Sequence, residues 1–326
     1  MSIILRLPKD LGEGVLCASA VKVLKEFSSS KDEALLLTGS ALMHGWVETF
    51  ADEKFNFVDI NSVDTSSVSA IVDFNIHDDF PEEDAFNVPY YALDDIEHID
   101  ETNIAYDEGA IVAPIHVVQM MEYTLKSLGA LSADESIEPT AISERLKRPE
   151  VVNQVKESLG LDLVKPIGLL IPSCAANRPN KRWQPESFAK MAGYMSDAGM
   201  QPVLTGGPTD DEIDLCDRIK QMSDVHVVDA CGKTGISELC SLASGSALAV
   251  GGDTGPIHLC AAAGVETFAL FGRGSDPNSW RPLAQNDAAH SIWVENLAEL
   301  SAEEVWDMVA VIHKSKDDEK EVPLSL

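Results

Sequence analysis

Residues 247–264 read ALAVGGDTGPIHLCAAAG, and this stretch decides how the chain folds. The apolar run at its start predicts a buried strand, and the Ala-rich run at its end predicts a helix. Between them, Thr254 is a good N-cap residue and Pro256 suits the first turn of a helix. A buried strand that leads directly into a helix is the building unit of a parallel α/β sheet.

The turn inside this stretch has the composition of an anion-binding site. Backbone N–H groups at the helix start are available to a ligand, and Gly255 allows the ligand to approach closely. Asp253 is unfavourable beside an anion, but it fits a ligand that carries hydroxyl groups next to its phosphates, as a nucleotide sugar does. His258 lies on the first turn of the same helix, where it can donate to phosphate or sugar; a purely structural role is the alternative.

The same alternation of strand-like and helix-like segments extends through the whole chain. Expected strands are 2–7, 34–39, 55–60, 69–74, 166–172, 201–207, 225–230, 247–250 and 267–272, and expected helices are 15–27, 115–128, 151–160, 185–198, 210–222, 236–243, 256–263 and 302–314. This pattern predicts an α/β protein of two doubly wound, Rossmann-like domains that face each other. We expect domains at 1–150 and 151–326, with the terminal helix either on the second domain or packed back on the first. A ligand is expected in the cleft, at the carboxyl ends of the strands.

The composition excludes several classes of function. The formal net charge is −30 and the pI is about 4.4, so binding to nucleic acid is unfavourable. The six cysteines have no metal-ligand spacing, and no GxGxxG follows a strand, which argues against a structural zinc and a dinucleotide enzyme. No apolar run is long enough to span a membrane and the N-terminus does not resemble a secretory signal, so we expect a cytoplasmic protein. The acid-rich segment 52–108 is interpreted as a solvated face, with a cationic or polyhydroxyl partner as the alternative.

Two more loops follow strands of the expected second domain and open onto the same edge of its sheet. The loop 172–188 contains small residues, including Ala176 and Asn177, and then Lys181, a point charge suited to phosphate. After a Gly-Gly turn, Asp211 and Glu212 open a helix. Acids there suit the helix dipole, and they are also placed to bind the two hydroxyls of a ribose; capping is the simpler role.

Three segments together resemble a known family. KPIGLLIPSCAANRPNKRWQPESFAKMA (165–192), VLTGGPTDDE (203–212) and GGDTGPIHLCAAAGVETFALFGRGSDP (251–277) are similar, in order and spacing, to the second domain of glycosyltransferase family 9. These are bacterial ADP-heptose:lipopolysaccharide heptosyltransferases, and the resemblance implies their GT-B fold. It also implies an acceptor-side domain at 1–150 and a nucleotide-sugar donor domain at 151–326. The first half is similar more loosely, through the opening strand, the loop after it and the helix that ends at Leu128-Gly129.

The resemblance also implies roles for individual residues. Lys181 would contact the donor diphosphate, and Asp253, Thr254, Gly255 and His258 would hold phosphate and sugar. One acid among Asp210, Asp211 and Glu212 would contact the ribose, and Thr234 would line the adenine pocket. The general base of the family is the Asp of an LGD loop; here Glu13 occupies that position, with Asp10 as a second candidate.

The expected reaction is inverting transfer of a heptose from ADP-heptose to a hydroxyl of a lipopolysaccharide core or related surface glycan. Because no Asp-x-Asp pair is suitably placed, we expect neither a metal nor another cofactor. The expected partners are the nucleotide-sugar donor and a glycan or glycolipid acceptor at the inner membrane surface; the oligomeric state is left open. The alternatives are another nucleotide sugar as donor, or a donor-binding protein with weakened or lost catalysis, because Glu13 replaces the usual Asp.

Overall fold

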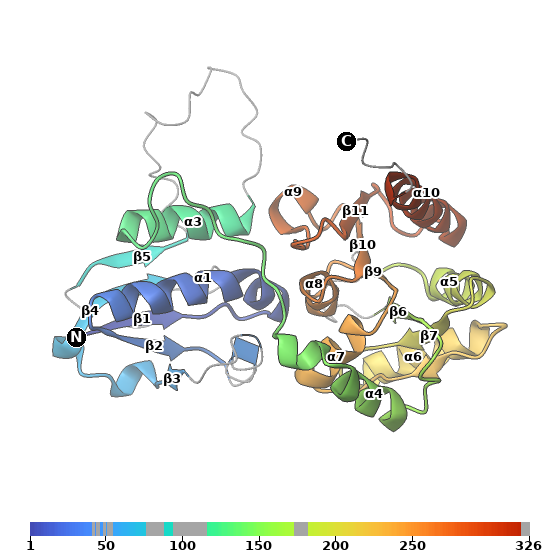
Figure 1. Ribbon diagram of the computed structural model, residues 1–326, viewed down its shortest axis with the longest axis horizontal. Helices are drawn as coiled ribbons and strands as arrows, with labels where there is room; N and C mark the ends of the chain where they lie inside the picture. Colours follow the sequence, from blue (N-terminus) through green and yellow to red (C-terminus); the bar gives the residue numbers. More distant parts are fainter. Residues whose placement is uncertain are drawn as a thin grey trace, which may run out of the picture.

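The protein forms two parallel β-sheets that lie side by side, each accompanied by helices (Figure 1). The computed structural model describes residues 1–40, 43, 46–47, 50, 55–75, 88–93, 116–172 and 182–320. All strand pairs among these residues are parallel. The predicted α/β class with two facing sheets is therefore confirmed.

The first sheet has the strand order β3-β2-β1-β4-β5. Its strands are β1 (Ser2–Arg6), β2 (Ala34–Thr38), β3 (Asn56–Phe57), β4 (Val68–Asp73) and β5 (Tyr90–Ala92). The helices beside it are α1 (Leu11–Ser30) and α3 (Val117–Leu128), and short 3-10 turns lie at Ile60–Ser62 and Thr65–Ser67. Gly129 ends α3 in the left-handed conformation, with φ of 79°, as its sequence position predicts.

The second sheet has the order β11-β10-β9-β6-β7-β8. Its strands are β6 (Ile167–Ile171), β7 (Gln201–Leu204), β8 (Val228–Asp229), β9 (Leu248–Gly252), β10 (Glu266–Phe271) and β11 (Ala289–Trp293). Its helices are α4 (Pro149–Ser158), α5 (Pro185–Asp197), α6 (Asp210–Met222), α7 (Ile236–Ser244), α8 (Gly255–Ala262), α9 (Pro277–Trp280) and α10 (Ala302–Lys320), with a 3-10 turn at Glu144–Lys147. The central strands β6 and β9 are buried at every position, which explains their unbroken apolar sequences.

The structure corrects the predicted start of the first helix. The sequence pattern indicated a helix from residue 15, whereas α1 begins at Leu11 and Asp10 is its extended N-cap residue. Gly12 and Gly14 weaken helix propensity in this turn, so the pattern alone did not indicate helix there. As a result, Glu13 lies on the first turn of a helix and not in a loop.

One of the apolar clusters contains residues from both halves of the molecule. The cluster around β1 and α1 includes Leu239 and Cys240 of α7 and Leu259 and Ala262 of α8. Helix α1 packs directly against α8, so the boundary between the sheets is a packed seam. The 3-10 turn before α4 belongs to the predicted first domain, yet both this turn and α4 contact α7 of the second. The division into domains at residue 150 therefore stays a prediction.

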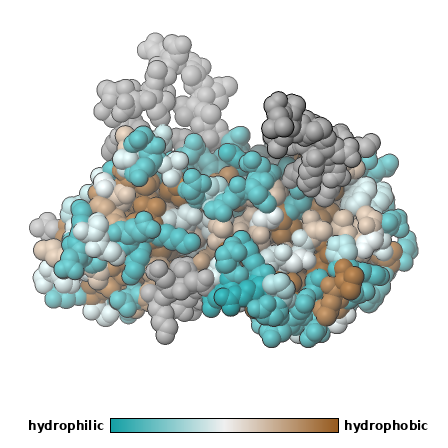
Figure 2. All heavy atoms as spheres, viewed as in Figure 1, coloured by the Kyte–Doolittle hydropathy of each residue, from teal (hydrophilic) through white to brown (hydrophobic). Residues whose placement is uncertain are grey.

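The terminal helix joins the second half over the part whose side chains are described. Val305 and Val309 of α10 are buried in the core of the second sheet, and the Trp306 ring stacks on Tyr194 of α5. None of the described helices is both long and apolar enough to cross a membrane. Hydrophilic residues spread over both halves of the face shown in Figure 2, as expected for a chain with net charge −30.

Gly251 of β9 tests how tightly the central strands are packed. A Cβ at this position would lie 2.7 Å from the Ile171 carbonyl oxygen of β6, a backbone atom that cannot rotate away. We therefore expect Gly251→Ala to lower the free energy of unfolding by about 1–3 kcal/mol, measured by urea denaturation. Gly193→Ala on α5 is the control: nothing lies within 4 Å of its Cβ position, so the variant should be as stable as the wild type or more stable. Equal stability of the Gly251→Ala protein and the wild type would contradict the tight packing.

Candidate functional site

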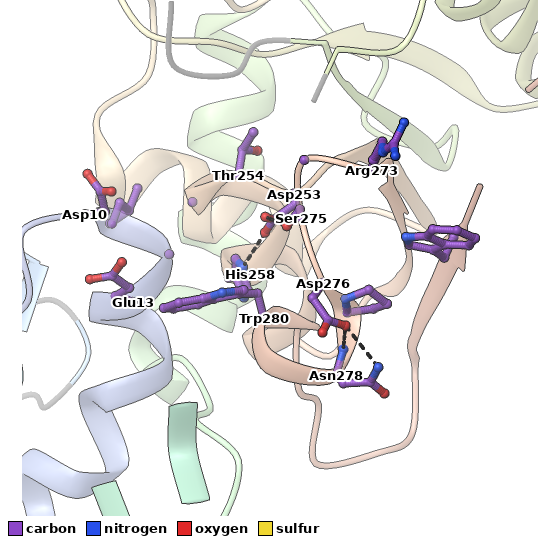
Figure 3. Close-up of a pocket in the computed structure, with 16 residues that line it drawn as sticks. Asp10, Glu13, Asp253, Thr254, His258, Arg273, Ser275, Asp276, Asn278 and Trp280 are labelled. Carbon is purple, nitrogen blue, oxygen red and sulfur yellow. Dashed lines mark hydrogen bonds and ion pairs between the residues drawn. The ribbon is translucent and has the colours of Figure 1, made fainter. Parts of the chain in front are cut away.

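A cavity of about 960 Å³ lies on the seam between the two halves (Figure 3). One wall is the start of α1, from Asp10 to Glu13, and the opposite wall is the start of α8 with the turn before it. The segment 273–280 after β10 and Trp293 at the end of β11 complete the lining. These segments follow or end β1, β9, β10 and β11, so the cavity lies at the carboxyl ends of strands from both sheets, where a ligand was expected.

Two glycines allow the helix starts to meet. A Cβ at Gly255 would lie 2.7 Å from the Leu11 Cβ, and a Cβ at Gly12 would lie 3.1 Å from Cδ2 of His258. Without side chains at these two positions, the first turns of α1 and α8 come into direct contact. Both turns direct unpaired backbone N–H groups and the positive ends of their dipoles toward the same region.

Asp253 is held by two polar neighbours. Its Oδ2 accepts a hydrogen bond from the Ser275 hydroxyl, and its Oδ1 lies 3.5 Å from Nε2 of His258. Only 4% of the His258 side chain and 9% of the Asp253 side chain are exposed. The carboxylate and the imidazole are thus fixed before any ligand arrives. The Nδ1 atom of His258 and the Thr254 hydroxyl are buried without a hydrogen-bond partner among the described residues.

Glu13 faces this group from the other half of the molecule. Figure 3 shows its side chain on the first turn of α1, close to the Trp280 ring, while Asp10 lies at the start of the helix. Glu13 is 7% exposed, an unusually deep position for a carboxylate. Together with burial, its charge raises the pKa of the Cys17 thiol one turn along the helix. The structure therefore brings six predicted residues to one cavity: Asp10, Glu13, Asp253, Thr254, Gly255 and His258.

The other predicted site residues lie away from the cavity or outside the residues that the structure describes. Glu212 holds the turn before α6, because its carboxylate accepts from the Gly207 N–H at 3.1 Å and from the Thr209 hydroxyl at 2.7 Å. Asp211 on α6 and Thr234 before α7 do not line the cavity. Ala176, Asn177 and Lys181 lie outside the described residues. Within the described part of the chain, no group of three or more His, Cys, Asp or Glu side chains is arranged to hold a metal ion.

The sequence reasoning missed the segment that follows β10. Ser275 positions Asp253, Asp276 accepts from the Asn278 N–H at 2.9 Å, and Trp280 packs against the cores on both sides of the seam. The motif FGRGSDP had been noted only for its resemblance. The signal that could have identified this segment is its position. It follows the carboxyl end of β10, the strand next to β9, and the carboxyl ends of neighbouring parallel strands open onto the same cavity.

His116 joins the two halves at the edge of this region. It is the N-cap of α3: Nδ1 accepts from the Val118 N–H at 3.2 Å, while Nε2 lies 3.0 Å from the Arg281 carbonyl oxygen. Because a carbonyl only accepts, Nε2 carries the proton and the ring is neutral. Burial lowers the pKa of His116 to about 4, helped by the charges of Arg281 and His258 and opposed by the hydrogen bond to Arg281.

Two parallel α/β sheets with a shared cavity at the carboxyl ends of their strands define a GT-B protein. The fold resembles the solved structure of an E. coli ADP-heptose lipopolysaccharide heptosyltransferase II, with a TM-score of 0.71 and 16% identity over 97% of this chain and 100% of that one. The model of glycosyltransferase family 9 (heptosyltransferase) matches residues 113–309, more than half of the chain. The chain belongs to glycosyltransferase family 9, which confirms the predicted family and enzyme class.

Two curated relatives show how far the similarity extends. The chain is 27% identical over 180 residues to lipopolysaccharide heptosyltransferase 3 of E. coli K12, covering 54% of this chain and 50% of that protein. It thus spans about half the length of this relative. It is 26% identical over 278 residues to lipooligosaccharide heptosyltransferase 2 of Campylobacter jejuni, covering 83% of this chain and 81% of the relative.

The buried neutral His116 predicts a pH dependence of stability. The unfolded state binds a proton near the ordinary pKa of 6.5, whereas the folded state does so only near 4. The stability present above pH 6.5 is therefore lost as the pH falls toward 4, and the loss from this residue at pH 5 is about 2 kcal/mol. In urea denaturation at pH 7.5 and pH 5, His116→Asn should lose less stability than the wild type, since Asn keeps the N-cap but does not titrate. Identical losses in the two proteins would contradict the assignment.

Proposed function

We propose that this protein transfers a heptose from ADP-heptose to a hydroxyl of a glycan acceptor, with inversion at the anomeric carbon. The observation that carries the proposal is the placement of Glu13 across the cavity from Asp253, Thr254 and Gly255. A carboxylate that acts as a base opposite a donor-binding helix start suits one direct displacement, and one displacement inverts the configuration. Membership of the heptosyltransferase family supports heptose as the transferred sugar.

In this proposal the start of α8 holds the donor. The diphosphate accepts from the free N–H groups of the first turn, and Gly255 leaves room for it beside the backbone. Asp253, fixed by Ser275, accepts from hydroxyls of the sugar. The nucleotide extends toward the loops after β7 and β8, where Asp211, Glu212 and Thr234 lie; because Glu212 already holds the turn before α6, Asp211 is the better candidate for the ribose.

The chemistry requires one proton transfer and one substitution. The Glu13 carboxylate removes the proton of the acceptor hydroxyl while that oxygen attacks the anomeric carbon. The bond from this carbon to the diphosphate oxygen breaks, and ADP leaves with the electron pair. The helix dipole of α8 and Lys181, assigned from the family resemblance, stabilise the negative charge on the leaving group without a metal ion.

We further propose that the acceptor is a lipopolysaccharide core or a related surface glycan, reached at the inner face of the cytoplasmic membrane. The curated relatives are lipopolysaccharide and lipooligosaccharide heptosyltransferases, which supports this class of acceptor. The net charge of −30 disfavours nucleic acid as a partner.

Replacing the proposed base tests the catalytic half of the mechanism. Glu13→Gln keeps the shape of the side chain but cannot accept the proton, so kcat should fall about 100-fold to 10,000-fold while the Kd for ADP-heptose stays unchanged. Transfer is measured as ADP release in the presence of a core oligosaccharide. Glu26→Gln, an exposed position on the same helix, is the matched control and should retain wild-type kcat. Wild-type kcat in the Glu13→Gln variant would exclude this residue as the base.

Calorimetric titration with ADP-heptose, and with UDP- and GDP-sugars alongside, tests the donor half. The wild type should bind ADP-heptose alone, and Asp253→Ala and Lys181→Ala should each weaken binding about 10-fold or more, because each removes a charged hydrogen-bond partner. Lys190→Ala, an exposed lysine of α5, is the control. If the protein binds a different nucleotide sugar and not ADP-heptose, that nucleotide sugar is the donor. If it binds ADP-heptose but transfers no sugar, the protein is a donor-binding protein without catalysis.

A further inference from the structure

We propose that the part of the cavity formed by Trp293, Arg273 and Trp280 is a subsite for a sugar ring of the acceptor glycan. The ring lies with its apolar C–H face on Trp293, and Arg273 donates hydrogen bonds to its polar substituents. This inference rests on the proposed function, since it assigns the acceptor side of the same cavity.

The strand order separates this region from the nucleotide. In the second sheet β10 and β11 lie on one side of β9, whereas β6, β7 and β8 lie on the other. The proposed nucleotide contacts follow β7 and β8, while Arg273 follows β10 and Trp293 ends β11. The cavity therefore extends from the reacting centre at α8 in the direction away from the nucleotide, which leaves this end for another part of the substrates.

The size of the cavity supports a second ligand. Sites for one small molecule usually measure about 300–1,000 Å³, and this cavity has about 960 Å³ although Asp211, Glu212 and Thr234, the described residues proposed to lie along the nucleotide, do not line it. Only the sugar and phosphate end of the donor thus needs to fit beside Asp253 and Gly255. The remaining volume is sufficient for a sugar ring of the acceptor.

Trp293 has the exposure of a binding residue. Ile292 before it is buried in the core, and the alternation along β11 turns the Trp293 side chain outward, where it is 50% exposed and lines the cavity. An indole presents a large apolar face and one N–H donor, which matches a pyranose ring with one C–H face and polar edges. Core packing does not require a tryptophan at a position this exposed.

Arg273 adds a polar contact beside this ring. Trp293 pairs in register with Phe271, two residues before Arg273, so the two side chains come from adjacent strand ends. The guanidinium is 82% exposed and lies 3.2 Å from Glu295, which is itself 64% exposed. Such an exposed ion pair contributes little stability, so Arg273 can exchange part of it for hydroxyl, carboxylate or phosphate groups of a glycan.

Trp280 connects the subsite to the reacting centre. Its ring lies beside Glu13 and His258 in Figure 3, and it packs against the apolar cores on both sides of the seam. This packing fixes the wall between the proposed base and the Trp293 side of the cavity. An acceptor glycan with one ring held on Trp293 can therefore extend along this wall and present a hydroxyl of another ring to Glu13.

The test is calorimetric titration with a deacylated, phosphorylated core oligosaccharide from lipopolysaccharide and with its dephosphorylated form, in the presence of ADP. Trp293→Ala should raise the Kd for both oligosaccharides about 10-fold or more, whereas Trp293→Phe, which keeps an aromatic face, should raise it much less. Val311→Ala, at a 67% exposed apolar position on α10 outside the cavity, is the control and should bind like the wild type. Arg273→Ala should weaken both forms if it binds hydroxyls, and mainly the phosphorylated form if it binds phosphate.

A titration of each variant with ADP-heptose separates this inference from the proposed function. The Kd for ADP-heptose should be unchanged in Trp293→Ala, which also shows that the variant is folded. Oligosaccharide binding by Trp293→Ala equal to that of the wild type would overturn the subsite while leaving the donor site intact. Wild-type protein that binds ADP-heptose but neither oligosaccharide would also overturn it, whereas failure to bind ADP-heptose would remove the proposed function as well.

Discussion

The direct contact between the first turns of α1 and α8 is the constraint on which the rest of the site depends. It exists because Gly12 and Gly255 carry no side chain: a Cβ at either position would press on His258 or Leu11. The contact places two positive helix ends at one cavity, and it brings Glu13 of one half opposite Asp253 and His258 of the other. Every chemical role that we assign follows from this approach of two segments that are about 240 residues apart in the sequence.

Polar groups at the seam are buried and held in place, which is favourable for catalysis and costly for stability. Asp253 is fixed by Ser275 and His258, so the proposed binding of a sugar at this carboxylate needs little reorganisation. His116 is kept neutral between the Val118 N–H and the Arg281 carbonyl, where it ties α3 to the segment that carries Trp280. A cleft between two sheets can thus be rigid on its walls and still open to ligands at its mouth.

The sequence allowed much of the architecture to be predicted because most elements have strong local signals. The runs that became β6 and β9 are apolar throughout, and Gly129 ended α3 where expected. Two short strands were missed, β5 and β11, and both lie at sheet edges; β8 was expected at 225–230 but pairs over two residues only. Their strand character comes from pairing with a neighbour, which no local pattern contains. The early start of α1 was missed for a similar reason, since tertiary packing outweighs two glycines in its first turn.

The sequence by itself determined the fold class, the family and the strand–turn–helix unit around Asp253, Thr254 and Gly255, because these depend on residue types at fixed spacing along the chain. Only the tertiary structure decided that Ser275 holds Asp253, that Glu212 is committed to the turn before α6, and that Trp280 and Trp293 line the same cavity as Glu13. These relations depend on which strand ends become neighbours and on how two sheets pack. Such packing is a property of the whole chain, so the residues that share one site are defined only once the chain has folded.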